Sequence, residues 1–406
     1  MKVEERLLKY VKIDTQSDPK SDSIPSTMRQ KDLARVLVEE MKEIGIADAH
    51  MDEYGYVYGT ILANVDGVET VGFIAHMDTS PEITGANVKP RIIENYDGKD
   101  IYLNEEVVAK VSIYPFLEEY KGKSLMVTDG NTLLGADDKA GIAEIMTMAE
   151  YFHTHPEVKH GTIKIGFTPD EEVGRGADKF NVEAFNADFA YTVDGSEPNC
   201  VAYENFNAAA VNVTVKGVSF HPGDSKNKMV NAINLAMKFH GLLPEHMRPE
   251  HTEGYDGFNH LMKIKGAIEL VELEYIIRNH SEEIFENQKK MFENAAEYLN
   301  KEYKDAIGLE FKDSYRNMKE GLKDKMFIVD LAKEAISEVG LVPKSEAIRG
   351  GTDGVALTYM GLPCPNLGTG GFNFHGRYEM CCIEDMRSCV DILIKIVEKV
   401  ATRKAK

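Results

Sequence analysis

The apolar stretch Val71-Gly72-Phe73-Ile74-Ala75 runs directly into His76-Met77-Asp78, and this stretch decides how the rest of the chain is interpreted. A continuous apolar run of this length is typical of a strand that is buried on both faces of a mostly parallel sheet. Residues 162–167 and 189–193 form two more such runs. Between the first two runs, the apolar spacing predicts a helix that begins near Lys139. This alternation of strands and helices predicts an α/β domain with a mixed, mostly parallel sheet flanked by helices.

The pattern changes in the middle of the chain. Val211, Val213 and Val215 alternate with polar residues, and the following segments predict the order β-α-β-β-α-β. The α/β pattern then returns and ends in a helix. We therefore predict a split catalytic domain at residues 1–207 and 317–406, with a smaller α+β domain inserted at 208–316.

The composition is that of an acidic globular protein. The 406 residues include 47 Lys and Arg against 67 Asp and Glu, a formal net charge of −20. Because such a surface repels phosphates and anionic lipids, we expect neither nucleic acid nor membrane as a partner. No stretch approaches the roughly 18 apolar residues of a membrane span, and no apolar signal core follows Met1. We expect a cytoplasmic protein, whose five cysteines lack a Cys-x-x-Cys spacing and stay reduced.

Side chains that can bind metal follow the ends of the apolar runs. They lie in five places, namely His76-Met77-Asp78, Gly135-Ala136-Asp137-Asp138-Lys139, Asp170-Glu171-Glu172, Asp194-Gly195 and His375. Because the carboxyl ends of parallel strands meet in one crevice, we expect these groups to lie close together. So much buried negative charge is costly unless cations neutralise it.

Imidazole and carboxylate without thiolate suit zinc, cobalt or manganese. Three carboxylate ligands would leave a net positive charge with two divalent ions, which favours ionisation of a bridging water and hence hydrolysis. Spacing alone does not separate Glu171 from Glu172, or Asp137 from Asp138, as ligands.

Other kinds of site are less well supported by the sequence. His153, His155 and His160 offer a rival metal cluster, but no acidic group accompanies them. The glycine-rich stretches at 349–354 and 368–371 lack the phosphate-binding spacings, so we interpret them as turns that line a substrate pocket. Neither a Gly-x-Ser-x-Gly elbow nor a His-Glu-x-x-His helix is present.

The five motifs together resemble the aminoacylase and glutamate-carboxypeptidase-like family of co-catalytic zinc metallopeptidases. Further similarity to the tripeptide aminopeptidases of that family covers almost the whole chain, including residues 168–174, 204–208, 275–278, 349–354 and 361–366. The resemblance implies release of the N-terminal residue from tripeptides by a metal-bridging hydroxide. The alternatives are a related dipeptidase, an N-acyl amino acid deacylase and a non-catalytic metal-binding homologue.

The resemblance also implies a role for each site residue. The predicted metal ligands are His76 and Asp194 for one ion, Glu172 and His375 for the other, and Asp137 for both. By the same resemblance Asp78 orients His76, and Glu171 is the general base. The implied cofactors are two divalent ions, Zn2+ by preference and Co2+ or Mn2+ as alternatives.

The resemblance makes the inserted domain a lid that could also form a homodimer. In it, His221 is expected to stabilise the oxyanion, from the same chain or from a partner subunit. Arg278 follows an apolar strand, where its guanidinium suits capture of a peptide carboxylate. Arg349 and Asp353, in the glycine-rich turn, complete the expected substrate-binding residues.

Overall fold

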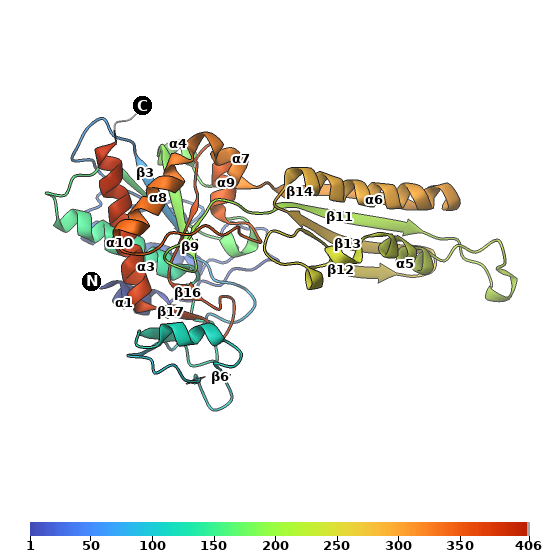
Figure 1. Ribbon diagram of the computed structural model, residues 1–406, viewed down its shortest axis with the longest axis horizontal. Helices are drawn as coiled ribbons and strands as arrows, with labels where there is room; N and C mark the ends of the chain where they lie inside the picture. The colour runs from blue at the N-terminus through green and yellow to red at the C-terminus, as the bar shows by residue number, and fades with distance from the viewer. Residues whose placement is uncertain (404–406) are drawn as a thin grey trace. The chain divides into compact units, whose positions relative to one another are not determined.

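The computed structural model describes residues 1–403 and contains two compact units (Figure 1). The larger unit comprises Met1–Tyr203, Gly321–Glu346 and Thr352–Lys406, and the smaller comprises Glu204–Glu320 with Ala347–Gly351. The segment 347–351 was expected in the catalytic domain. It packs with the smaller unit because Arg349 donates hydrogen bonds to the carbonyls of Gly254 and Asp256.

A seven-stranded mixed sheet forms the centre of the larger unit, as the apolar runs predict. Its order is β1 (His50–Met51), β2 (Val57–Ile61), β8 (Ile163–Thr168), β3 (Val71–His76), β9 (Phe189–Gly195), β15 (Asn366–Gly368) and β10 (Val201–Ala202). The four strands β8, β3, β9 and β15 run parallel, whereas β1, β2 and β10 pair antiparallel with their neighbours. All six residues of β3 are buried, so the predicted fold class is confirmed.

Helices flank this sheet. The long α3 packs against β3 and β9, and α1, α8 and α10 join it in one group. These four helices are α1 (Val3–Tyr10), α3 (Ala136–Thr154), α8 (Phe327–Glu338) and α10 (Ile383–Thr402). The remaining helices of this unit are α2 (Gln30–Glu43), α4 (Val182–Phe185) and α9 (Asp353–Tyr359). Ile74 of β3 shares a core cluster with Phe185 of α4 and Leu357 of α9, so helices cover the sheet on that side too.

A second, four-stranded sheet in the larger unit was not predicted. Its order is β16 (Gly371–Phe372), β17 (Met380–Cys382), β7 (Leu125–Val127) and β4 (Arg91–Ile93), and β5 (Ile101–Tyr102) pairs nearby with β6 (Val108–Ala109). The loop between β16 and β17 carries His375. Phe372 packs on Phe116 and Tyr120, and this aromatic cluster supports the loop.

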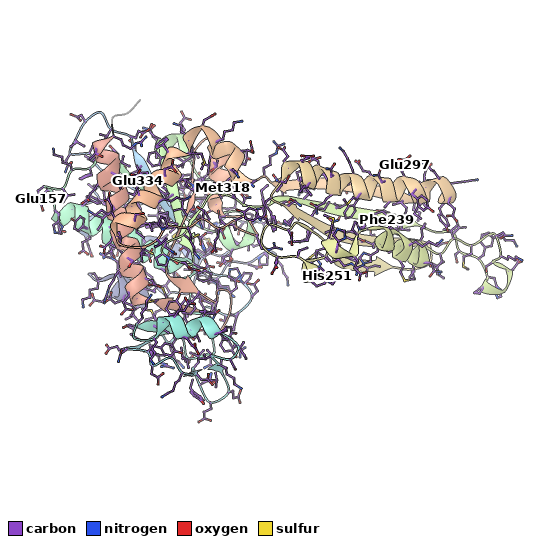
Figure 2. All side chains as sticks on the ribbon, in the orientation of Figure 1. Glu157, Phe239, His251, Glu297, Met318 and Glu334 are labelled. Atoms are coloured by element: carbon purple, nitrogen blue, oxygen red, sulfur yellow. The ribbon has the colours of Figure 1, made fainter. Side chains whose placement is uncertain are left out.

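The smaller unit is one antiparallel sheet with two helices. The strand order is β12 (Phe258–Gly266), β13 (Leu270–Asn279), β11 (Asn207–Lys216) and β14 (Ile307–Tyr315), with α5 (Ala232–Leu242) and α6 (Glu282–Tyr303) packed on the sheet and α7 (Met318–Leu322) after it. This is the predicted order β-α-β-β-α-β. Phe239 of α5 lies in the core between helix and sheet, whereas Glu297 of α6 faces solvent (Figure 2). Within residues 1–403, no helix is long and apolar enough to cross a membrane.

Candidate active site and metal centre

Three neighbouring parallel strands deliver candidate ligands to one edge of the sheet. His76 is the last residue of β3, and Asp194 lies near the end of β9. Glu172 follows β8 in a short 3-10 helix, η2 (Glu171–Val173). Because β8, β3 and β9 are adjacent and parallel, their carboxyl ends bring these side chains together.

Asp137 lies between the two histidines of the site. It stands at the start of α3, directly before the regular helix that begins near Lys139. Its Oδ1 is 2.9 Å from Nε2 of His76, and its Oδ2 is 3.2 Å from Nε2 of His375. One carboxylate therefore faces both imidazoles.

Two donor groups that could each hold a cation share this carboxylate. One consists of His76, Asp137 and Asp194, and the other of Asp137, Glu172 and His375, with the donor atoms of each group within 4.8 Å of one another. The His76 ring lies 3.5 Å from Asp194, and the His375 ring lies 3.0 Å from Glu172. Among residues 1–403 no other group of three or more His, Cys, Asp or Glu side chains converges in this way.

Burial and crowding control the charges of these groups. Burial raises the pKa of Glu172 to about 7 and that of Asp194 to about 6. Burial opposes ionisation of Asp137 as well, but hydrogen bonds from His375 and His76 hold its pKa below the ordinary value. The same contacts with Asp137 and Glu172 raise the pKa of His375 to about 11.

The donor set fits divalent cations. It offers two imidazoles and three carboxylates, which are the ligands that zinc and similar ions bind. The Oε1 atom of Glu172 is buried and has no hydrogen-bond partner, so one acceptor at the site remains available. Positive charge entering the cluster would let all three carboxylates ionise.

Asp78 fixes the surroundings of His76. Its fully buried carboxylate accepts hydrogen bonds from the backbone N–H groups of Glu171 and Glu172, at 2.9 and 3.1 Å. Its own backbone carbonyl lies 3.0 Å from Nδ1 of His76. Nδ1 of His76 donates to this carbonyl, and Nε2, which faces Asp137 and Asp194, would bind an ion once it gives up its own proton.

Glu171 belongs to neither donor group, although it is adjacent to Glu172. Burial raises its pKa well above the ordinary value of a glutamate. Asp78 holds its backbone N–H. A carboxyl group in this setting retains a proton readily.

Asp138 is distinguished from Asp137 by what its carboxylate binds. Its Oδ2 accepts the backbone N–H of His76 at 3.1 Å, and its Oδ1 accepts that of Gly141 at 3.2 Å. The side chain of Asp138 is thus committed to the backbone.

Two acidic residues near the site were not predicted from the sequence. Glu82 lies 3.2 Å from Nδ1 of His375, on the ring edge opposite Asp137. Glu379 accepts hydrogen bonds from three backbone N–H groups around Asp137. Neither position belongs to a motif with a fixed spacing. For Glu379 the available signal was its place four residues after His375 in the sequence.

The expected substrate-binding residues lie in different surroundings. Asp353 is buried at the start of α9, where it accepts a hydrogen bond from Thr168 Oγ1 at 2.7 Å, and burial raises its pKa to about 7. His221, Arg278 and Arg349 belong to the smaller unit. His221 is exposed, whereas the guanidinium of Arg278 lies over the Tyr315 ring, 5.4 Å from its centroid.

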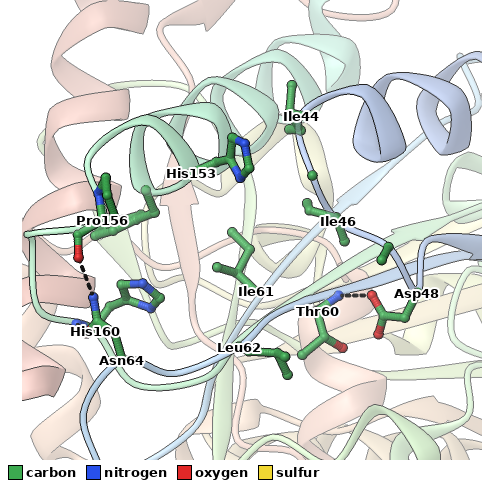
Figure 3. Close-up of a pocket in the computed structure, with 13 residues that line it drawn as sticks. Ile44, Ile46, Asp48, Thr60, Ile61, Leu62, Asn64, His153, Pro156 and His160 are labelled. Atoms are coloured by element: carbon green, nitrogen blue, oxygen red, sulfur yellow. Dashed lines mark hydrogen bonds between the residues drawn. The ribbon is translucent and has the colours of Figure 1, made fainter.

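The rival histidine cluster does not form. His153 and His160 line a separate cavity of about 430 Å³, together with Ile46 and Phe152. Figure 3 shows His153, His160 and Ile46 around it. His160 Nδ1 is bonded to the Gly161 carbonyl, and His155 stacks on Tyr151. Among the described residues these three rings do not form a group that could hold an ion.

Comparisons with known proteins agree with this fold. Residues 203–306 match the peptidase dimerisation domain. The chain is 52% identical to peptidase T of Alkaliphilus oremlandii over 97% of this chain and 98% of the relative, and 52% identical to peptidase T of Halothermothrix orenii over 99% and 100%. The crystal structure of aminopeptidase PepT from Bacillus cereus, 24% identical, has the same fold with a TM-score of 0.79, covering 99% of this chain and 98% of that one. Its sequence identity to these relatives over nearly its whole length shows that this chain belongs to the peptidase T family.

Proposed function

We propose that this chain is a metal-dependent aminopeptidase that releases the N-terminal residue from tripeptides. The observation that carries the proposal is the pair of donor groups that share Asp137. Membership of the peptidase T family supports the peptide substrate. Similarity of fold to an aminopeptidase and to a tripeptidase from Staphylococcus aureus is consistent with it.

His76, Asp137 and Asp194 would hold one divalent ion, and Asp137, Glu172 and His375 would hold the other. Zinc is the preferred metal because the donors are nitrogen and oxygen atoms, and cobalt or manganese would also suit them. When bound, such ions supply a Lewis acid for the scissile carbonyl and lower the pKa of a nearby water. The mutual distances of the donor atoms are what support this assignment.

Glu171 is the proposed general base. It takes a proton from the attacking water and returns it to the leaving amine nitrogen. Burial favours its protonated form, and the backbone hydrogen bond to Asp78 keeps its segment in place. Asp78 in turn would orient His76 through the contact at Nδ1.

The smaller unit would act as lid and as dimer interface, as its match to the peptidase dimerisation domain suggests. Arg278 would bind the terminal carboxylate of the peptide, and His221 would stabilise the oxyanion. Arg349 and Asp353 would shape the pocket between glycine-rich turns. We place the enzyme in the cytoplasm, with small peptides as its partners.

A cleavage panel tests the function directly. It compares a dipeptide, a tripeptide, a tetrapeptide, an N-acetylated tripeptide and an N-acyl amino acid, each with and without chelator. Preferential cleavage of the free-amine tripeptide, abolished by chelator, is the expected result. Preference for the N-acyl amino acid or the dipeptide would instead assign the chain to a related amidohydrolase activity.

A further inference from the structure

We propose that the buried carboxylate of Glu379 is a positioning residue that holds Asp137 and His375 together and so sets the affinity for the second ion. By the second ion we mean the one that Asp137, Glu172 and His375 would bind, so the inference rests on the proposed two-metal function. Glu379 is 1% exposed and is not itself a member of either donor group.

The side chain of Glu379 accepts hydrogen bonds from the turn that contains Asp137. Its Oε2 accepts the backbone N–H groups of Leu134 and Gly135, each at 2.7 Å, and its Oε1 accepts that of Asp137 at 3.0 Å. These three donors lie in the turn that leads into α3, ahead of its regular helix near Lys139. The carboxylate satisfies buried backbone N–H groups there.

The same residue also belongs to the segment that carries His375. The backbone N–H of Glu379 donates to the carbonyl of Gly376, so His375 and Glu379 lie on one tight turn between β16 and β17. His375 has a left-handed backbone, with φ of 61°, which few residues other than glycine adopt. By joining this turn to the Asp137 turn, Glu379 fixes the 3.2 Å approach of His375 Nε2 to Asp137 Oδ2.

Two other acidic residues that lie outside both donor groups act on the backbone in the same manner. Asp78 accepts the N–H groups of Glu171 and Glu172, and Asp138 accepts that of His76. Each buried carboxylate therefore restrains a segment that delivers candidate ligands. Glu379 does the same for the segments that carry Asp137 and His375, two of the ligands proposed for the second ion.

The burial of Glu379 is hard to explain by packing alone. A buried carboxylate is costly unless several donors compensate it, and an apolar side chain would fill the same space without that cost. Glu379 makes no ion pair among the described residues, and the hydrogen bonds that its side chain accepts from them all come from the Asp137 turn. Its position therefore makes sense as a restraint on that turn.

The restraint does not extend to the first ion's other ligands. His76 and Asp194 come from β3 and β9, whose positions follow from pairing within the central sheet. Loss of the Glu379 carboxylate should therefore weaken binding of the second ion, for which both Asp137 and His375 lose their placement, more than binding of the first ion, for which only Asp137 does.

The test is a titration of the metal-free full-length chain with Co2+ or Zn2+. Binding is measured by calorimetry and, for Co2+, also by visible absorption. Glu379→Gln places an NH2 group against backbone donors and breaks part of the restraint. Glu384→Gln is the matched control, because Glu384 accepts a backbone N–H from Ser124, away from the Asp137 turn. Circular dichroism of the metal-free variants checks that each is folded.

We expect Glu379→Gln to bind the second ion about 10–100-fold more weakly, with an altered Co2+ spectrum, and to lose less affinity for the first ion, which shares only Asp137. Glu384→Gln should match wild type at both sites. Wild-type affinity for both ions in Glu379→Gln, or equal weakening of both, would overturn the proposal. If Glu379→Gln does not fold, Glu379→Asp decides by the same criteria. Failure of the underlying two-metal function would be seen separately, as fewer than two ions bound by the wild-type chain.

Discussion

Oδ1 of Asp137 lies 2.9 Å from Nε2 of His76, although the two residues are 61 positions apart in the sequence. The contact joins the end of β3 to the start of α3. Because the other oxygen of the same carboxylate faces His375, Asp137 links two groups of donors that would otherwise be separate. The proposed chemistry depends on this shared carboxylate.

Glu171→Gln should retain both metal ions but lose about 10²–10⁴-fold in kcat, because the amide cannot accept the proton. Steady-state kinetics and elemental analysis of the same preparation provide the measurement. Glu183→Gln, at an exposed position on α4, serves as the control and should keep full activity. Loss of metal from Glu171→Gln would contradict its assignment as base and make it a ligand.

Arg278→Ala should raise KM for a tripeptide with a free carboxylate while changing kcat little, because the lost contact is made equally in the ground state and the transition state. For wild type, amidation of the peptide C-terminus should have a similar effect on KM. The two changes should not add, since both remove one interaction. An amidation effect of undiminished size in Arg278→Ala would exclude carboxylate recognition by this residue.

We predict that Glu144 makes the free energy of unfolding depend on pH. It is fully buried on α3, neither carboxylate oxygen has a hydrogen-bond partner, and burial raises its pKa well above the usual value. Above the unfolded pKa of about 4.5 the unfolded chain releases this proton while the folded chain retains it. The free energy of unfolding therefore falls as pH rises from about 4.5 toward the pKa of Glu144 in the folded chain.

Glu144→Gln removes that dependence. Its stability relative to wild type should increase with pH between 5 and 7.5, by at most about 1.4 kcal/mol per pH unit. Denaturant unfolding of the metal-free proteins at several pH values measures the difference. The exposed control Glu157→Gln should show a much smaller trend. A stability difference for Glu144→Gln that does not change with pH would show that Glu144 is ionised in the fold.

The central sheet and its ligand-bearing edge could be predicted because they rest on continuous patterns of apolar residues. Buried parallel strands read as continuous apolar runs, so the position of His76 after the run 71–75 was informative. The inserted unit was equally visible, because Val211, Val213 and Val215 alternate on one face of β11 and are buried. Family resemblance, and not spacing, separated Glu171 from Glu172.

Other features carry no such signal. Strands β16 and β17 contain two and three residues, which is too short for periodicity to appear. Glu379 acts on backbone N–H groups, which every residue other than proline possesses, so no side-chain pattern marks its partners. The packing of Arg349 with the smaller unit depends on carbonyls nearly a hundred residues away.

The shared role of Asp137 is tested most directly by counting metal ions. Wild-type protein and Asp137→Ala, both purified with added Zn2+ and desalted, are compared by elemental analysis, with Glu171→Gln as a variant that keeps every proposed ligand. The proposed assignment predicts two ions per chain for wild type and Glu171→Gln, and fewer than two for Asp137→Ala. Two tightly bound ions in folded Asp137→Ala would contradict it.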